Sequence, residues 1–418
     1  MPGGALLLAL RGASDILLTG NPEMTLFKTV YRRHTPFSYE NVRQYFVGQP
    51  GFGQRVYIRL GNRGDLVGRM YLEMTLPNLN LYPQQNPDYV VSWVNGIGNF
   101  IIREVEVQIG GTTFDKQYGQ WMQIWHELSL PDEKKPAYRL LTGYHVDFTP
   151  ATQPGPLKLR VPLNFWFNHN LGLVLPLIQL SAQEVRIYFS FQDFESCWVS
   201  NTGGAPGLGG LESSEIESLE FQNTWLNVDY YFLGDEERKR FVMEKEVETL
   251  IPQLQVGVFP VQNIDENLTL SFTRPVKELV WVFQSALEEA QDPVRSKEPF
   301  DFSNGATPPG DPLTEARIWV NGEEIFRDFR DNLYFRVLQP YQYHTSVPLS
   351  QFIYLYSWAQ YPEAWQPSGT LDFSATDSVV LQIHVPQEVA GPGAVCNVYA
   401  VNYNWMTIRD GMAFLAWA

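Results

Sequence analysis

The sequence is poor in cysteine, in histidine and in positive charge. It has 2 Cys and 6 His among 418 residues, and 30 Lys and Arg against 46 Asp and Glu give a formal net charge of −16. Two cysteines cannot form the dense disulfides of a small secreted scaffold, so we predict that Cys197 and Cys396 are buried free thiols. The acidic balance argues against direct, sequence-specific nucleic-acid binding as the main task.

Long apolar runs are also missing. The early run ALLLAL at residues 5–10 follows no charged segment, and no stretch reaches the roughly 20 apolar residues of a membrane-spanning helix. We therefore expect neither a secretory signal nor a membrane span.

Motifs for catalysis are missing as well. No HExxH, His-x-His, GxSxG or phosphate-binding loop pattern occurs, so the sequence predicts no enzyme, no metal site and no cofactor. The histidines are scattered along the chain, at His34, His126, His145, His169, His344 and His384.

Turn-forming and aromatic residues are abundant instead. The chain has 32 Gly and 29 Pro, and 14% of its residues are aromatic, a composition typical of many short strands joined by tight turns. A length of 418 residues exceeds what one hydrophobic core usually holds, so two domains are expected.

One hairpin pattern occurs twice. Residues 105–121 (VEVQIGGTTFDKQYGQW) and 316–329 (ARIWVNGEEIFRDF) each have alternating apolar residues, a Gly-Gly or Asn-Gly turn, and a second alternating run. A second pair of similar segments follows in the same order, at residues 180–189 and 373–383. The two pairs of similar segments predict one all-β unit used twice.

The predicted fold is all-β, with two tandem eight-stranded antiparallel jelly-roll β-sandwiches joined by a short helical linker. The predicted boundaries are an N-terminal arm at 1–40, a first jelly roll at 41–234, a linker at 235–246 and a second jelly roll at 247–418. Helices are expected at 235–245 and 122–130, and a helical turn is expected from Pro22 to Thr29.

Residues 12–37, GASDILLTGNPEMTLFKTVYRRHTPF, closely resemble the N-terminal signature of the major capsid proteins of nucleocytoplasmic large DNA viruses. Further matches follow in family order to the C-terminus, among them GFGQRV, NRGDLV, VDYYFLGDEERKRF and VYAVNYNWMTIRDGMAFLAWA. The resemblance implies a homotrimer that forms a pseudo-hexagonal capsomer and tiles an icosahedral virion shell over an internal membrane. It also implies neighbouring capsomers, minor capsid and penton proteins as partners, and assembly in the cytoplasm of the infected cell.

The resemblance assigns the N-terminal arm to the inner side of the shell. Residues 1–73 carry nine basic and five acidic side chains, which suits contact with a membrane or a minor capsid protein. Six apolar residues of the arm are expected to be buried on assembly: Leu6, Leu8, Leu17, Leu18, Leu26 and Phe27. The candidate contact residues are Arg11, Lys28, Tyr31, Arg32, Arg33 and His34.

Two alternatives stay open. The chain is short for this family and has modest loops, which also fits a minor capsid paralogue of the same fold. Tryptophan-rich stretches at 121–125 and 358–365 also occur in carbohydrate-binding or carbohydrate-hydrolysing jelly-roll proteins, where aromatic rings stack on sugars.

Surface features complete the expectations. The N-glycosylation motif at Asn267 lies in a predicted strand, so we expect it to be unmodified. Loops at 82–88, 131–136, 201–210 and 288–312 are expected to supply trimer contacts or outer surface.

Overall fold

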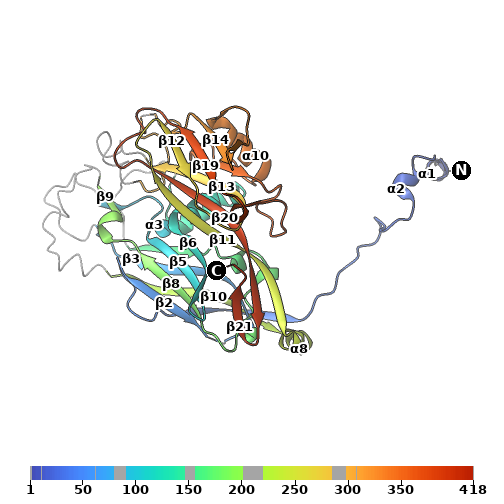
Figure 1. Ribbon diagram of the computed structural model, residues 1–418. Coiled ribbons are helices and arrows are strands. Elements are labelled where there is room, and N and C mark those ends of the chain that lie inside the picture. Colours follow the sequence, from blue (N-terminus) through green and yellow to red (C-terminus); the bar gives the residue numbers. More distant parts are fainter. Residues whose placement is uncertain are drawn as a thin grey trace. The chain divides into compact units, whose positions relative to one another are not determined.

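The structure is a computed structural model that describes residues 2–10, 12–61, 63–79, 91–145, 156–200, 220–284, 298–306 and 308–417. The chain divides into two compact units, Met1–Pro36 and Phe37–Ala418. The larger unit is built of antiparallel β-sheets with short helices beside them, and it contains both halves of the predicted repeat (Figure 1).

The smaller unit contains two short helices, α1 (Gly3–Ala9) and α2 (Ile16–Thr19). The predicted helical turn from Pro22 to Thr29 is wrong, because those residues are not helical. The backbone amide of Phe27 donates a hydrogen bond to the hydroxyl of Thr25 at 3.3 Å, and such local contacts compete with helix formation.

Two four-stranded sheets form the first half of the larger unit. Sheet 1 has the strand order β1-β10-β3-β7, and sheet 2 has the order β2-β8-β5-β6. A short pair, β4 (Val91–Trp93) with β9 (Trp198–Ser200), lies outside both sheets. The strands of sheets 1 and 2 are β1 (Phe37–Gln44), β2 (Arg55–Leu60), β3 (Leu66–Leu76), β5 (Ile102–Ile109), β6 (Thr112–Tyr118), β7 (Leu157–Pro162), β8 (Val185–Phe191) and β10 (Gln222–Leu233).

Two further sheets form the second half. Sheet 3 has the order β11-β20-β13-β17, with β18 added beside β13 and β21 beside β20. Sheet 4 has the order β12-β19-β14-β15, with β16 added beside β14. Their strands are β11 (Glu246–Pro260), β12 (Asp265–Thr269), β13 (Pro275–Gln284), β14 (Glu315–Val320), β15 (Glu323–Glu324), β16 (Arg330–Asp331), β17 (Tyr354–Ser357), β18 (Leu371–Asp372), β19 (Val379–His384), β20 (Val395–Arg409) and β21 (Met412–Leu415).

The two halves have the same strand order, element by element. In each half the first strand pairs with the last long strand, as β1 does with β10 and β11 with β20. The two predicted hairpins are β5–β6 and β14–β15. The second pair of similar segments forms β8 and β19, which pair with β5 and β14. Both pairs of similar segments therefore lie on equivalent strands, as the repeat requires.

The two hairpin turns have the same backbone geometry. Gly110 and Gly111 have φ of 61° and 89°, and Asn321 and Gly322 have φ of 53° and 81°. Two consecutive positive φ angles define the type I′ turn, which matches the twist of the flanking strands and favours Gly and Asn. The Gly-Gly and Asn-Gly pairs are thus the sequence cause of both hairpins.

Short helices connect the strands. The predicted helices at 122–130 and 235–245 are confirmed as α4 (Gly119–Ser129) and α8 (Asp235–Met243). Helix α5 (Lys135–Thr142) begins inside the segment 131–136, which was expected to be a loop. The π-helical segment η6 (Tyr334–Leu338) continues into α10 (Gln339–Tyr343) in the second half. The others are α3 (Ile97–Phe100), α6 (Trp166–His169), and the 3₁₀ turns η2 (Leu171–Leu173), η3 (Leu177–Gln179), η4 (Phe194–Ser196) and η7 (Phe373–Ala375).

Each half has its own hydrophobic core, and each core includes residues of the other half. The first core contains Met406 and Ile408 from β20, while the second contains Trp121 and Ile124 from α4. Both cysteines are buried and free, as predicted. The halves are therefore packed into one another rather than merely linked.

Candidate functional site

The N-terminal arm is the first part of the candidate site. Lys28, Tyr31, Arg32, Arg33 and His34 are all exposed, and residues 29–36 form neither helix nor strand. Nδ1 of His34 lies 2.8 Å from the backbone oxygen of Thr35. The sixth candidate, Arg11, lies outside the described residues.

The apolar residues of the arm are exposed within the single chain. Leu17 is 89% exposed and Phe27 is 98% exposed, and Leu6, Leu8, Leu18 and Leu26 are exposed as well. Large apolar side chains exposed in this number are typical of a segment that is covered by a partner. Burial of these residues on assembly, as the sequence predicts, therefore stays a prediction.

The junction between the two halves is the second part of the candidate site. Helix α4 of the first half packs on strand β20 of the second, where the ring centroids of Trp121 and Tyr399 lie 5.2 Å apart. Asn397 Nδ2 donates to Gln120 Oε1 at 2.9 Å, and the hydroxyl of Tyr399 donates to the same oxygen. The aromatic contact and the amide hydrogen bonds thus fix α4 against sheet 3.

The strand edges of the two halves also meet. Gln253 Nε2 donates to the backbone oxygen of Phe114, and the backbone amide of Leu254 donates to Asp115 Oδ1 at 3.4 Å. Asp115 is fully buried, and burial raises its pKa to about 7 although Gln117 and two backbone amides donate to it. A carboxyl group that becomes charged near neutral pH is therefore built into the junction.

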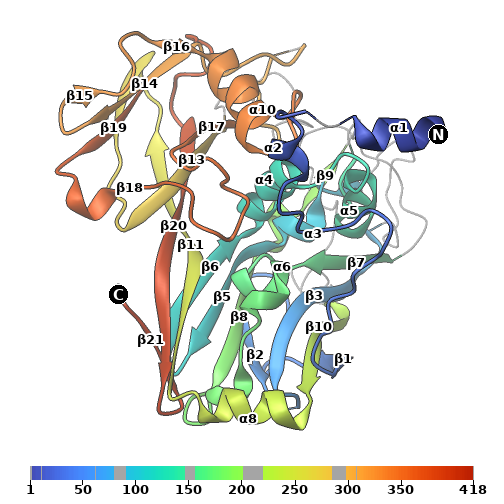
Figure 2. The same cartoon turned by 90° about the vertical axis from the view of Figure 1, so that its right-hand side faces the viewer.

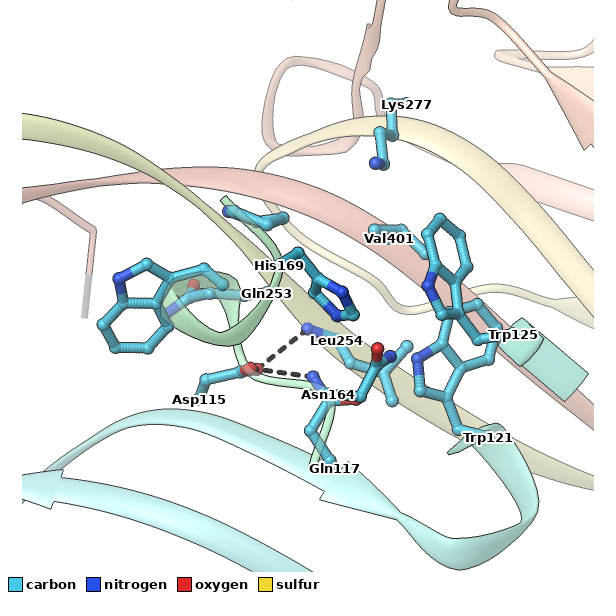
Figure 3. Close-up of a pocket in the computed structure, with 12 residues that line it drawn as sticks. Asp115, Gln117, Trp121, Trp125, Asn164, His169, Gln253, Leu254, Lys277 and Val401 are labelled. Carbon is cyan, nitrogen blue, oxygen red and sulfur yellow. Dashed lines mark hydrogen bonds between the residues drawn. The ribbon is translucent and has the colours of Figure 1, made fainter. Parts of the chain in front are cut away.

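A cavity of about 60 Å³ lies at this junction and is lined from both halves. Figure 3 shows Asp115 and Gln117 on one side, the rings of Trp121 and Trp125 on another, and Lys277 reaching in from the second half. Within the described chain, Gln117 Oε1 has no hydrogen-bond partner. Buried polar atoms of this kind are satisfied by ordered water where the space is sufficient, and one water needs about 10–15 Å³.

A buried ionic cluster lies next to Lys277, which lines the cavity. Nε2 of His344 lies 3.0 Å from Glu278 and its Nδ1 lies 3.0 Å from Glu363, and the side chains of His344 and Glu278 are 0% exposed. Burial alone would lower the pKa of His344, but attraction to Glu278 and hydrogen bonds to both carboxylates raise it to about 9. Lys277 beside them donates to the backbone oxygen of Pro362. The cluster ties residues 344–363 to strand β13.

The sequence did not indicate this cluster as a site. Lys277 and Glu278 interrupt an otherwise apolar strand, PVKELVWVF, and this interruption was the available signal. Charged residues are almost never fully buried unless they are paired, so two in a core strand imply partners elsewhere. Sequence spacing alone could not identify His344 and Glu363 as those partners.

Four loops were expected to supply trimer contacts or outer surface, and the structure describes one of them fully and another in part. Residues 82–88 and 201–210 lie outside the described residues. In the loop 131–136, Lys135 is buried and donates to Ser346 of the second half. The described end of the loop 288–312 packs inward, because Phe300 and Phe302 are buried. These two segments therefore include contacts within the chain.

Asn267 lies in strand β12, as predicted, and its side chain is exposed. Trp121 is 2% exposed against Tyr399 and is therefore not available to stack on a sugar. Trp365 is exposed. Among the described residues, no helix is long and apolar enough to cross a membrane, and no group of His, Cys, Asp and Glu is arranged to bind a metal ion.

Family models match both halves of the chain. Residues 25–234 match the model of the major capsid protein N-terminus. Residues 237–414 match that of the large eukaryotic DNA virus major capsid protein. The boundary between the two matches falls at the start of helix α8.

Curated relatives match over their full length. The chain is 35% identical to the major capsid protein of Pyramimonas orientalis virus and 33% identical to that of Phaeocystis pouchetii virus, each with 100% of both chains covered. It is 30% identical to the major capsid protein of Paramecium bursaria Chlorella virus 1, again over 100% of both chains.

Solved structures agree with the sequence matches. A chain of the PBCV-1 virus capsid superposes with a TM-score of 0.74 at 28% identity, covering 94% of this chain and all of that one. The Faustovirus major capsid protein gives a TM-score of 0.75 at 13% identity, covering 95% and 94%, which supports the fold. The predicted tandem jelly-roll fold is confirmed, and the chain belongs to the family of major capsid proteins of large eukaryotic DNA viruses, which are structural proteins of the virion.

Proposed function

We propose that the chain forms homotrimers, that each trimer is a pseudo-hexagonal capsomer, and that capsomers tile an icosahedral shell over an internal membrane. The observation that carries the proposal is the duplicated barrel: one chain contains two barrels with the same strand order, packed firmly together. Three such chains place six equivalent barrels around one axis. Closed rings of this kind are the usual product of heterologous contacts whose rotation closes.

In this proposal the N-terminal arm, residues 1–40, lies on the inner side of the shell. Its exposed Lys28, Arg32 and Arg33 suit an anionic lipid surface or an acidic patch on a minor capsid protein. Its exposed leucines provide the apolar surface for the same contact. Residues 41–234 and 247–418 are the proposed barrels, and 235–246 is the proposed linker.

The proposed role is structural, without catalysis or a cofactor. The function then depends only on the free energy of association between copies. Interfaces of obligate oligomers bury more than about 2,000 Å². Penton proteins, minor capsid proteins and neighbouring capsomers are the proposed partners, and assembly takes place in the cytoplasm of the infected cell.

Light scattering of the purified protein tests the proposal. We expect a stable species of three times the 47.9 kDa chain mass. A variant that lacks residues 1–24 should keep that mass yet yield few closed particles by electron microscopy when it is expressed with the other shell proteins. A wild-type protein that stays monomeric at all concentrations contradicts the trimer, and normal particle yield from the shortened variant contradicts the role of the arm.

A further inference from the structure

Strand β21 and the end of β20 form a hairpin that lies against the first barrel, although both strands belong to the second half of the sequence. In Figure 2 the long strands β11 and β20 run down from the second barrel past the first, and β21 lies at their lower end. On β21, Ala413 is buried in the first core and Leu415 packs against that core. The alternate residues, Met412 and Phe414, are exposed. One face of β21 therefore covers the first core, and the other face is exposed in the single chain.

The turn of this hairpin is fixed to the segment that precedes β8. Asp410 and Gly411 have φ of 52° and 82°, which defines a type I′ turn. The backbone oxygen of Gly411 accepts a hydrogen bond from the amide of Ala182 at 3.1 Å. The amide of Ala413 donates to Gln183 Oε1 at 2.8 Å. Two hydrogen bonds thus dock the turn on the first barrel.

Asn404 holds the other end of the hairpin. Its side chain is fully buried, its Nδ2 donates to the backbone oxygen of Trp417 at 2.7 Å, and its Oδ1 accepts from the amide of Trp417 at 3.2 Å. The same Nδ2 donates to Gln253 Oε1 at 3.0 Å, and Gln253 donates to the backbone oxygen of Phe114. Asn404 therefore connects the hairpin to the junction between the barrels.

We propose that residues 410–417 are a latch that closes the first barrel. The first barrel reaches its full stability only when this latch is docked, and undocking is a local opening that uncovers the first core while the second barrel stays folded. Strand β21 is four residues long, pairs with β20 and has an exposed outer face. Short segments of this kind open at a lower free energy than the whole protein. The inference goes beyond the proposed shell function and does not depend on the trimer.

The position of the latch in the sequence sets an order of folding. The strands of sheets 1 and 2 end with β10, whereas the latch follows β20. During synthesis the strands of the first barrel are therefore complete long before the latch is made, although domains generally fold from the N-terminus onward. A chain whose second barrel is misfolded cannot dock the latch. The stability of the first barrel thus depends on correct folding of the second.

Hydrogen exchange of the full-length variant Gly411→Ala tests the latch. The added Cβ would lie 2.7 Å from Ser181 Oγ and 3.2 Å from the backbone nitrogen of Ala182, so the docked turn must shift. Amides in the central strands exchange only when a barrel opens. Amides of β3 and β8 should therefore exchange about tenfold faster or more than in the wild type, while those of β13 and β19 keep their rates.

The matched control is Gly322→Ala, in the turn of the second hairpin. Gly322 has φ of 81°, against 82° for Gly411, so a Cβ is equally strained by the backbone at both positions. A Cβ on Gly322 meets no atom within 4 Å, whereas one on Gly411 meets the first barrel. The control should leave exchange in β3 and β8 unchanged.

A disulfide that locks the latch gives the opposite change. The Cβ of Ala182 lies 3.2 Å from a Cβ placed on Gly411, close to the roughly 3.5–4.5 Å that a disulfide needs. In the variant Ala182→Cys, Gly411→Cys, the oxidised protein should exchange the amides of β3 and β8 more slowly than the reduced protein. Both forms carry the same substitutions, and the native thiols are buried. The difference between the two forms therefore measures the latch alone.

The outcomes are distinct. Faster exchange confined to the first barrel in Gly411→Ala, together with slower exchange in the oxidised double variant, supports the latch. Equal acceleration in both barrels overturns it, because the hairpin then belongs to one cooperative unit. Unchanged exchange of the first barrel in Gly411→Ala, or equal exchange in the oxidised and reduced double variant, also overturns it. If Gly411→Ala does not fold, the comparison of the oxidised and reduced forms decides.

Discussion

The sharpest test of the fold's energetics is the removal of His344 from the buried ionic cluster. The substitution His344→Gln keeps a side chain of similar size and a hydrogen-bonding amide, but it removes the positive charge beside Glu278. Glu278 is then a buried carboxylate whose remaining nearby cation is Lys277, and one of its oxygens, Oε1, already lacks a hydrogen-bond partner in the described chain. Breaking one side of a buried pair costs about 3–5 kcal/mol.

The pKa of His344 gives an independent magnitude. A folded-state pKa of about 9 against the ordinary 6.5 corresponds to about 3 kcal/mol at 1.36 kcal/mol per pKa unit. Because the folded-state pKa is the higher one, this contribution is complete below pH 6.5 and is lost as the pH rises through about 9. Burial would raise the pKa of Glu278, but His344 and Lys277 lower it below 4.5, so its contribution is lost as the pH falls below that value.

Urea unfolding at pH 7 and at pH 9.5 measures the effect. We expect the variant to unfold at lower urea with an unchanged slope at pH 7, and to differ less from the wild type at pH 9.5. The control His384→Gln removes a histidine whose partner, Asp265, is exposed, and it should cost less than about 1 kcal/mol. A loss below about 1 kcal/mol for His344→Gln, with the same pH dependence as the wild type, would refute the reasoning.

Two further predictions concern the junction between the barrels. Burial raises the pKa of Asp115 to about 7, so the ionisation of Asp115 makes an unfavourable contribution to stability that grows as the pH rises from about 4 to 7. Asp115→Asn should remove this contribution and be more stable than the wild type at pH 8 by up to about 4 kcal/mol, and a difference in melting temperature that stays the same from pH 4 to pH 8 would contradict it. Gly119→Ala places a Cβ 2.0 Å from the backbone oxygen of Asn99 and 2.5 Å from that of Ile102, so α4 must shift. We expect Gly119→Ala to lower the free energy of unfolding by about 2 kcal/mol or more in chemical unfolding. In the control Gly61→Ala, the added Cβ meets no atom within 4 Å and should leave stability unchanged. Equal stability of the two variants would contradict the packing argument.

The sequence was informative where structure follows from local pattern. The hairpin at Gly110 and Gly111 and its copy at Asn321 and Gly322 were predictable because type I′ turns demand residues that tolerate positive φ. Alternating apolar residues in β8 and β19 likewise indicated strands buried on one face. The acidic first turn of α8 indicated a helix start.

Long-range pairing was not predictable in this way. Glu278 and His344 are 66 residues apart, and no periodicity links them. The segment 131–136 was expected to be a loop because its sequence, PDEKKP, is polar, yet α5 begins within it and Lys135 is buried against Ser346 of the other half. Such contacts depend on how two barrels meet, and this geometry is a tertiary property that local propensity does not encode.

The exchange of core residues between the barrels has a consequence for the shell. Strands β20 and β21 contribute Met406, Ile408 and Ala413 to the first core, and α4 contributes Trp121 and Ile124 to the second. Rotation of one barrel against the other would therefore expose apolar surface in both cores at once, at about 25 cal/mol for each Å² uncovered. The angle between the barrels is thus fixed by the same packing that stabilises each of them. In the proposed trimer each chain therefore contributes a pair of barrels whose relative angle is already set when the single chain folds, before any two copies meet.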